Sequence, residues 1–362
     1  MLEAPLAPYL LWAKTRQPTA IDLAGSNLLS CTLDDMPGAL EAVDITAPND
    51  NGYPPLTSAI ARHYGVSDNH VVTGHGCSGA NFLAIAALVG AGDDVLVERP
   101  TYDPLLGACA LMGARIERFD RRFDDGWRID LDAVRARLTP RTRLIIVTSP
   151  HNPTGVVTGA DTLAALGRLA SEVGAQVLVD EVYLDAANSI AGADARVAPA
   201  ARLDGPFIST SSLTKSYGLA GLRCGWAVSA PEIAVRIRRT RDVVDNAESA
   251  PADRLATCAF DRLPALAERA RTLLGGNVAR ARAFFSAHPE LELVEPPRAS
   301  VVFPRLLGLA DASPFIKRLL EAYGVAVAPG HFFDAPAHFR ISLAGRPEAL
   351  AAGLDRLAEA LA

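Results

Sequence analysis

Three residue types that can do chemistry follow short apolar runs in the middle of the sequence. Asp180 and Tyr183 come directly after the run 176–179, and Lys215 comes shortly after the run 207–210. A lysine amine is a nucleophile toward carbonyl groups, and a carboxylate favours a positive charge on a neighbouring group. Each also has an ordinary explanation, because lysines are mostly surface residues and an aspartate after a strand often caps a helix.

Two further turns in this region have a composition suited to ligands. The turn after 71–73 reads Gly74-His75-Gly76-Cys77-Ser78-Gly79-Ala80. Free backbone N–H groups at a helix N-terminus form an anion site, although a tight turn needs glycine in any case. The turn after 144–148 contains His151-Asn152-Pro153-Thr154-Gly155, in which the asparagine could equally be a plain turn residue before proline.

The runs that precede these turns have the pattern of buried strands. Candidate strands lie at 71–73, 94–97, 115–118, 144–148, 176–179, 207–210 and 225–228, and helical stretches lie among them at 79–89, 131–138 and 162–173. Such an alternation predicts an α/β fold with a mostly parallel seven-stranded sheet. Ligands of open α/β sheets bind beyond the carboxyl ends of the strands, so we expect the turns to meet at one edge.

The character of the sequence changes near residue 250. A helical stretch at 252–277 is followed by helices at 279–287 and 314–323 and by short strands at 300–303 and 339–343. We therefore predict a large domain over 46–250 and a smaller α+β domain formed by 1–45 together with 251–362.

Composition narrows the class of protein. The net charge of −6 argues against nucleic acid as a partner, because phosphate contacts need a basic surface. The 5 cysteines are scattered, which indicates free thiols in a reducing compartment, and no residue pattern suggests a metal site. The apolar stretch 9–12 is too short for a membrane span or a signal sequence. We expect a cytoplasmic protein with no membrane contact, whose N-terminal arm packs against the body or against a partner subunit.

Taken together, the motifs resemble those of the class I and II aminotransferases, which are fold type I enzymes that depend on pyridoxal 5'-phosphate (PLP). The resemblance covers nearly the whole chain in order and spacing, over 51–56, 76–80, 100–102, 151–155, 180–183, 212–223 and 339–343. It implies a large PLP-binding domain, a homodimer with shared active sites, and transfer of an amino group from an α-amino acid to a 2-oxo acid.

The resemblance assigns the catalytic centre to Lys215, Asp180 and Tyr183. Lys215 would form an imine with the PLP aldehyde and, once displaced by substrate, would move the proton at the substrate Cα. Asp180 would keep the pyridine nitrogen protonated, so that the ring can take up electrons. Tyr183 and Asn152 would hydrogen-bond the phenolic oxygen of the cofactor.

The remaining cofactor contacts follow from the same resemblance. The phosphate would be held by the turn and by two later side chains, namely Gly76, Cys77, Ser78, Ser212 and Arg223. Arginine suits this role because its planar fork binds phosphate oxygens in pairs. Tyr102 would cover the face of the pyridine ring, or it could be an ordinary core residue. Tyr53 would reach the phosphate of the neighbouring subunit.

Arg340 would bind the α-carboxylate of the substrate through two parallel hydrogen bonds, with Asn152 beside it. The alternative for Arg340 is an exposed position on a strand. If the assignment holds, the substrate is an α-amino acid and not a simple amine.

The chain departs from the family pattern in two places. Gly76 stands where Ser or Ala is frequent, and the segment 22–29 replaces a glycine–proline pattern that lines the substrate pocket. The second departure leaves the choice of substrate and reaction open. His75 and His151 lie beside the active-site turns, where a hydrogen-bonded or solvated loop histidine is expected.

Two alternative functions follow. The same residues serve PLP-dependent lyases, decarboxylases, racemases and oxidases or cyclases in specialised amino-acid biosynthesis, because the fold does not fix the fate of the Cα carbanion. The other alternative is a PLP-binding regulator of DNA, but residues 1–45 are too few for both a DNA-binding domain and the arm of the smaller domain.

Overall fold

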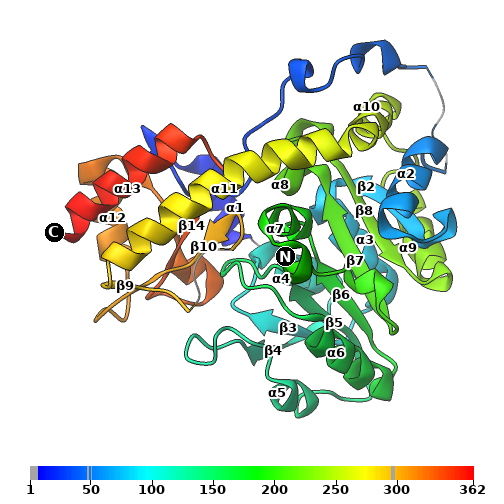
Figure 1. Ribbon diagram of the computed structural model, residues 1–362. Helices are drawn as coiled ribbons and strands as arrows, with labels where there is room; N and C mark the ends of the chain where they lie inside the picture. The colour runs from blue at the N-terminus through cyan, green and yellow to red at the C-terminus, as the bar shows by residue number, and fades with distance from the viewer. Residues whose placement is uncertain (1–6, 47–48, 50, 295–297) are drawn as a thin grey trace.

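A seven-stranded sheet forms the centre of the larger part of the molecule (Figure 1). The computed structural model describes residues 7–46, 49, 51–294 and 298–362. The sheet has the order β2-β8-β7-β6-β5-β3-β4, and its strands are β2 (Val71–His75), β3 (Asp94–Arg99), β4 (Arg115–Asp120), β5 (Thr142–Thr148), β6 (Gln176–Asp180), β7 (Phe207–Ser212) and β8 (Cys224–Ser229). β8 runs antiparallel to β2 and β7, and the other neighbouring pairs are parallel. The predicted mostly parallel sheet is confirmed.

Helices cover both faces of this sheet, which explains the continuous apolar run in its central strand β5. Alternate residues of β5 face opposite sides: Leu144 and Ile146 pack with α3 (Gly76–Leu88), α4 (Asp103–Leu111) and α9 (Pro231–Val244). Ile145 and Val147 pack on the other side with α5 (Leu131–Arg135) and α6 (Ala160–Val173).

The carboxyl ends of the central strands meet at one edge, as expected. Thr148 of β5, Asp180 of β6 and Thr210 of β7 are register partners in adjacent strands. The short helices α7 (Leu184–Ile190) and α8 (Leu213–Tyr217) begin just beyond this edge, and α3 begins where β2 ends. Every turn singled out in the sequence therefore opens on the same side of the sheet.

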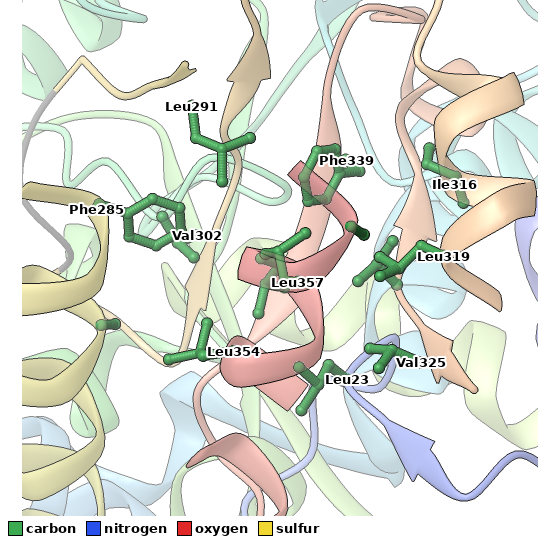
Figure 2. Close-up of a cluster of buried hydrophobic side chains, with 14 of the residues drawn as sticks. Leu23, Phe285, Leu291, Val302, Ile316, Leu319, Val325, Phe339, Leu354 and Leu357 are labelled. Atoms are coloured by element: carbon green, nitrogen blue, oxygen red, sulfur yellow. The ribbon is translucent and has the colours of Figure 1, made fainter. Parts of the chain in front are cut away.

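The smaller part of the molecule has short strands and three long helices around a second core. Its strands are β1 (Ile21–Asp22), β9 (Leu291–Glu292), β10 (Val301–Val302), β11 (Arg305–Leu306), β12 (Val325–Ala326), β13 (Ala328–Pro329) and β14 (Phe339–Ser342). The helices are α11 (Leu263–Ala287), α12 (Ser313–Tyr323) and α13 (Pro347–Leu361). Figure 2 shows their apolar side chains meeting across β14, with Phe285, Leu319, Phe339, Leu354 and Leu357 at the centre.

The helices after residue 250 differ from the predicted ones. Instead of one helix to 277 and a second from 279, α10 (Ala250–Asp261) ends before Arg262, and α11 continues unbroken to Ala287. The reason is Pro264, which has no N–H to donate and fits only the first turn of a new helix. Gly275 and Gly276 do not interrupt α11, because glycine weakens a helix without blocking it.

Helix α11 links the two cores, as Figure 1 shows. Leu266 near its start packs with Leu56 of α2 (Pro54–Tyr64), in a cluster that also holds Ala256 of α10, and Phe285 near its end packs in the smaller core. The predicted division into 46–250 and 1–45 with 251–362 stays a prediction. At the N-terminus, α1 (Pro8–Thr15) packs against the body through Tyr9.

Candidate active site

A cavity of about 770 Å³ opens at the carboxyl edge of the sheet, between the two cores. Most residues predicted for the site line it: Cys77, Ser78, Tyr102, Asn152, Asp180, Tyr183, Ser212, Lys215 and Arg223. The arm contributes Tyr9 and Leu10, and the divergent segment contributes Asp22, Gly25, Ser26 and Asn27. These residues follow strands across the width of the sheet, from β2 to β3, and others come from the N-terminal segment. The cavity therefore forms only when the whole chain has folded.

Lys215 projects from the first turn of α8 toward the divergent segment. Its Nζ donates to Ser26 Oγ at 2.9 Å and to Asn27 Oδ1 at 2.5 Å, and lies 5.9 Å from the ring centre of Tyr183. Burial, with the nearby Arg340 charge, lowers the pKa of Lys215 to about 7, and Asp180 opposes this shift. Near neutral pH, a large fraction of this lysine is therefore an uncharged, nucleophilic amine.

Asp180 is buried at the end of β6 and accepts several hydrogen bonds. Asn81 Nδ2 donates to one carboxylate oxygen at 2.7 Å, while the backbone N–H of Val182 donates to the other at 3.1 Å. The Cys77 thiol lies 3.4 Å from that second oxygen. Burial raises the pKa of Asp180, and these donors counteract the shift by stabilising the charged form.

Two tyrosines in the cavity stay protonated. Burial raises the pKa of Tyr183 to about 12, and burial likewise raises the pKa of Tyr102 above its ordinary value. Tyr183 is therefore a hydrogen-bond donor at physiological pH. The ring of Tyr102 packs edge-on against Tyr9, with ring centres 6.3 Å apart.

The β2–α3 turn and Arg223 form one unit. Gly76 has φ +69°, and its N–H donates to the carbonyl of Arg223 at 2.7 Å. A Cβ at this position would lie 2.5 Å from Arg223 Nη2, which accounts for glycine where the family often has Ser or Ala. Arg223 itself has φ +51°, a conformation rarely adopted by residues other than glycine. The guanidinium is thereby placed beside the N-terminus of α3, where backbone N–H groups are free.

Arg340 lies fully buried on β14 behind the wall of the cavity. Its guanidinium donates to Asn152 Oδ1 at 2.8 Å, to the Ala24 carbonyl at 3.1 Å and to the Tyr9 hydroxyl. Within the described residues, no acidic side chain pairs with Arg340, and its Nε has no hydrogen-bond partner. A buried cation without an anion is costly unless a ligand neutralises it. The exposed position considered from the sequence is therefore wrong.

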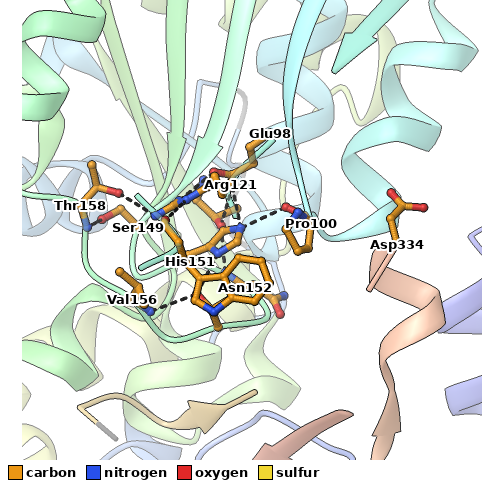
Figure 3. A network of polar contacts seen from close by, with 12 residues as sticks. Glu98, Pro100, Arg121, Ser149, His151, Asn152, Val156, Thr158 and Asp334 are labelled. Atoms are coloured by element: carbon orange, nitrogen blue, oxygen red, sulfur yellow. Dashed lines mark hydrogen bonds and ion pairs between the residues drawn. The ribbon is translucent and has the colours of Figure 1, made fainter. Parts of the chain in front are cut away.

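A buried polar network fixes the loop that carries Asn152 (Figure 3). Glu98 accepts from the N–H and hydroxyl of Thr148 at 2.6 and 2.8 Å and from Arg121 at 2.9 Å. The hydroxyl of Thr148 in turn accepts from the backbone N–H of Asn152 at 2.9 Å.

His151 belongs to the same network. Its ring nitrogens bond to Thr154 Oγ1 at 2.8 Å and to the Pro100 carbonyl at 3.0 Å. Burial lowers the pKa of His151 well below its ordinary value, so the ring is neutral. His151 is thus a hydrogen-bonded loop residue, as expected. His75 is partly exposed, 3.5 Å from Asp245.

Tyr53 is the predicted site residue that the structure places away from this cavity. It precedes α2, and its hydroxyl accepts from Arg254 at 3.2 Å in a hollow that Glu41 and Asp44 also line. Asn81 and Tyr9 are site residues that were not predicted from the sequence. Asn81 sits in an apolar helix and Tyr9 in an arm with no motif, so neither carried a signal.

The described side chains fit PLP. Arg223 lies against Gly76 beside the N-terminus of α3, where it can meet an anion, Asp180 offers an anionic partner for a pyridinium, and Lys215 offers a neutral amine. Among the residues that the structure describes, no group of His, Cys, Asp and Glu could hold a metal ion. In the same part of the chain, no helix combines the length and apolarity needed to cross a bilayer.

Comparison with known proteins gives a family match over most of the chain. The family model of aminotransferase class I and II matches residues 39–361. A capreomycidine synthase of Streptomyces vinaceus is 32% identical over 309 residues, which is 84% of this chain and 78% of that protein. A probable N-succinyldiaminopimelate aminotransferase DapC of Mycobacterium tuberculosis (strain CDC 1551 / Oshkosh) is 32% identical over 326 residues, 84% of this chain and 80% of that protein.

The fold is also similar to solved structures. The crystal structure of a PLP-dependent aminotransferase from Streptococcus suis 89-1591 superposes with a TM-score of 0.92 at 26% identity, covering 99% of this chain and 98% of that one. The two-part architecture described above is therefore shared with an enzyme that uses PLP.

Proposed function

Since the chain belongs to the class I and II aminotransferases, and is therefore a PLP-dependent enzyme that moves an amino group between amino acids and keto acids, we propose that this chemistry takes place in the cavity around Lys215. The proposal depends on one observation: the neutral amine of Lys215, the buried carboxylate of Asp180, and Arg223 beside the Gly76 turn all face the same cavity.

Each residue has a task that its surroundings support. When bound, PLP supplies an aldehyde and a ring that takes up electrons. Lys215 would be the amine for the aldehyde and then the base that moves a proton at the substrate Cα. Asp180 would hold a positive charge on the ring nitrogen, and Tyr183 and Asn152 would donate to the phenolic oxygen. Tyr102 covers the ring.

The anionic end of the cofactor would lie at the N-terminus of α3. Cys77 and Ser78 offer backbone N–H groups there, while the N–H of Gly76 is used in the turn, where it donates to the carbonyl of Arg223. Two side chains complete the set, Ser212 and Arg223. Ser212 also accepts a hydrogen bond from the N–H of Thr214 at 3.3 Å, which fixes its hydroxyl at the start of α8.

The substrate is an α-amino acid whose α-carboxylate binds Arg340. The guanidinium has no acidic partner among the described residues and is oriented by Asn152 and Tyr9. A planar fork held in this way suits the two oxygens of a carboxylate.

Replacing Lys215 tests the proposal. The purified protein should show a visible absorption band from bound PLP that borohydride reduction fixes to the chain, and Lys215→Ala should lose the band and turnover. Lys317→Ala is the matched control, because Lys317 is exposed on α12. A Lys215→Ala protein that still forms a borohydride-reducible bond would refute the assignment.

A second candidate is another PLP-dependent reaction at an α-amino acid, such as a lyase, decarboxylase, racemase, oxidase or cyclase reaction. It is favoured by similarity to a protein named a synthase and by the divergent segment, which places Asp22, Ser26 and Asn27 in the cavity wall. To decide between them, an amino acid is added until the visible spectrum changes, and then a 2-oxo acid is added. Recovery of the starting spectrum indicates amino transfer, and a 2-oxo acid without effect indicates the alternative.

We also propose that the enzyme is a cytoplasmic homodimer that binds small molecules and no nucleic acid. The five cysteines are free thiols, which suits a reducing compartment, and the net charge is −6. Leu33, Leu40 and Ile45 are exposed on the segment near Tyr53, as expected for a surface that a second subunit covers. Tyr53 would then act in the site of the partner.

A further inference from the structure

Asp180 is held by a donor that none of the recognised motifs contains. Asn81 lies one turn into α3, and its side chain is 4% exposed. Its Nδ2 donates to Asp180 Oδ2 at 2.7 Å, and its Oδ1 accepts from Thr210 Oγ1 at 2.5 Å. Because both ends of the amide are engaged, the N–H group is fixed in the direction of the carboxylate.

The two oxygens of Asp180 are held from different elements. The oxygen opposite Asn81 accepts from the Val182 N–H, which follows β6, and lies near the Cys77 thiol at the start of α3. Each oxygen has two acceptor positions: those of Oδ1 are used by Val182 and Cys77, and Oδ2, which accepts from Asn81, has one left for a donor in the cavity that Asp180 lines. The amide therefore fixes the carboxylate without blocking it.

The surroundings of Asn81 explain why a polar residue is needed. Its neighbours in α3, Leu83, Ala84 and Ile85, are buried apolar residues of the larger core. A buried amide in such a helix is unfavourable unless all its groups are paired. A buried carboxylate likewise loses its charge unless hydrogen bonds stabilise the ionised form.

We propose that Asn81 is a positioning residue, which Thr210 orients and which holds the Asp180 carboxylate charged and directed at the pyridine nitrogen of PLP. This rests on the proposed function, since Asp180 acts on the ring. Asn81 touches neither substrate nor cofactor, and its effect passes through Asp180.

The test replaces Asn81 with leucine in the holoenzyme, which keeps the branched shape of the side chain and removes the donor. We expect PLP to be released into a trapping protein about 10- to 100-fold faster and kcat to fall by a similar factor, while KM for the amino acid changes little, because Arg340 is untouched. Thr210→Val should shift both quantities in the same direction by less, since the amide stays but is free to turn.

The matched control is Asn277→Leu, which removes a buried asparagine that donates to the carbonyls of Leu343 and Gly345. It should lower the thermal unfolding midpoint without faster PLP release. Unchanged release and kcat in both Asn81→Leu and Thr210→Val would overturn the proposal, as would losses no larger than those of the control. If the wild-type protein neither retained PLP nor turned over amino acids, the proposed function would fail instead.

Discussion

The low pKa of Lys215 determines how readily its amine reacts near neutral pH. Only the neutral amine attacks an aldehyde, and burial and the Arg340 charge lower the pKa of Lys215 to about 7. As pH rises through this value, the neutral fraction of the amine increases.

We predict that the cofactor-free protein takes up PLP faster as pH rises, with a midpoint at about 7. Removal of the nearby positive charge in Arg340→Met should move the midpoint upward, because a neighbouring cation disfavours the charged ammonium. The measurement is the rate of absorbance change after mixing with PLP at a series of pH values. A midpoint that stays in place in Arg340→Met would show that Arg340 does not act on Lys215.

Individual residues differ in how well the sequence predicts their position. Asp180 and Lys215 lie at the carboxyl ends of neighbouring strands and Arg223 follows Lys215 by eight residues, in the order and spacing of the family motifs, so their convergence on one cavity was predictable. Asn81 and Tyr9 were not, because their partners are Asp180 and Arg340, 99 and 331 positions away in the chain. The first contact exists only once α3 has packed on the sheet, and the second only once the N-terminal arm has packed on the smaller core.

At the scale of elements, the conformation of the β2–α3 turn requires glycine at position 76. Gly76→Ala would put a Cβ 2.5 Å from Arg223 Nη2 and force a methyl-bearing residue to φ +69°. We predict that PLP affinity falls by roughly 10-fold or more, because the guanidinium must leave the anion site. Titration of the cofactor-free protein with PLP measures this.

The control for the turn is Gly107→Ala in α4, where a Cβ meets nothing within 4 Å. Alanine is favoured over glycine in a helix, so this variant should bind PLP like the wild type and gain about 0.5–1 kcal/mol in stability. Equal PLP affinity in both glycine variants would contradict the role of Gly76.

The loop after β5 depends on a buried ion pair. Glu98 and Arg121 are both buried, 2.9 Å apart, and Glu98 also accepts from Thr148, which holds the Asn152 backbone. We predict that Glu98→Ala lowers the free energy of unfolding by about 3–5 kcal/mol, because Arg121 stays buried without its anion. Urea unfolding of the cofactor-free protein measures the difference.

Glu172→Ala provides the comparison for the ion pair. Its partner is Arg135 at 2.8 Å, but both side chains are about half exposed, so we expect a loss of about 1 kcal/mol or less. Losses of similar size in the two variants would mean that the buried network does not stabilise the loop.

Strands, helix ends and buried charges differ in how well the sequence predicts them. The strands were predictable because most contain a short run of apolar residues between helical stretches, as β5 does, although β4 alternates charged and apolar residues. The break between α10 and α11 was not, because 252–277 has helical composition throughout and Pro264 is allowed in a first turn as well as at a kink. The network around Glu98 was also missed, since buried charges look like surface charges in a sequence.

At the scale of the whole molecule, two cores meet over one cavity. The larger core supplies Lys215 and Asp180, and the smaller one supplies Arg340 and, through β1 and the segment after it, Ser26 and Asn27. The site is therefore complete only when both parts are folded. Tyr53 remains apart, in a hollow beside Arg254.

This separation leads to a test of the proposed homodimer. Tyr53→Ala and Lys215→Ala should each lose most activity when alone. If Tyr53 serves the partner's site, a mixed dimer has one site in which Lys215 and the Tyr53 of the other subunit are both unchanged. Random mixing makes half of the dimers mixed, and each of these has one working site of two. About one quarter of the wild-type activity should therefore return. Turnover is measured after co-refolding the two variants in equal amounts.

If Tyr53 instead serves its own chain, every site in the mixture lacks one of the two residues, and no activity returns. A Tyr53→Ala protein as active as the wild type would remove Tyr53 from the site altogether.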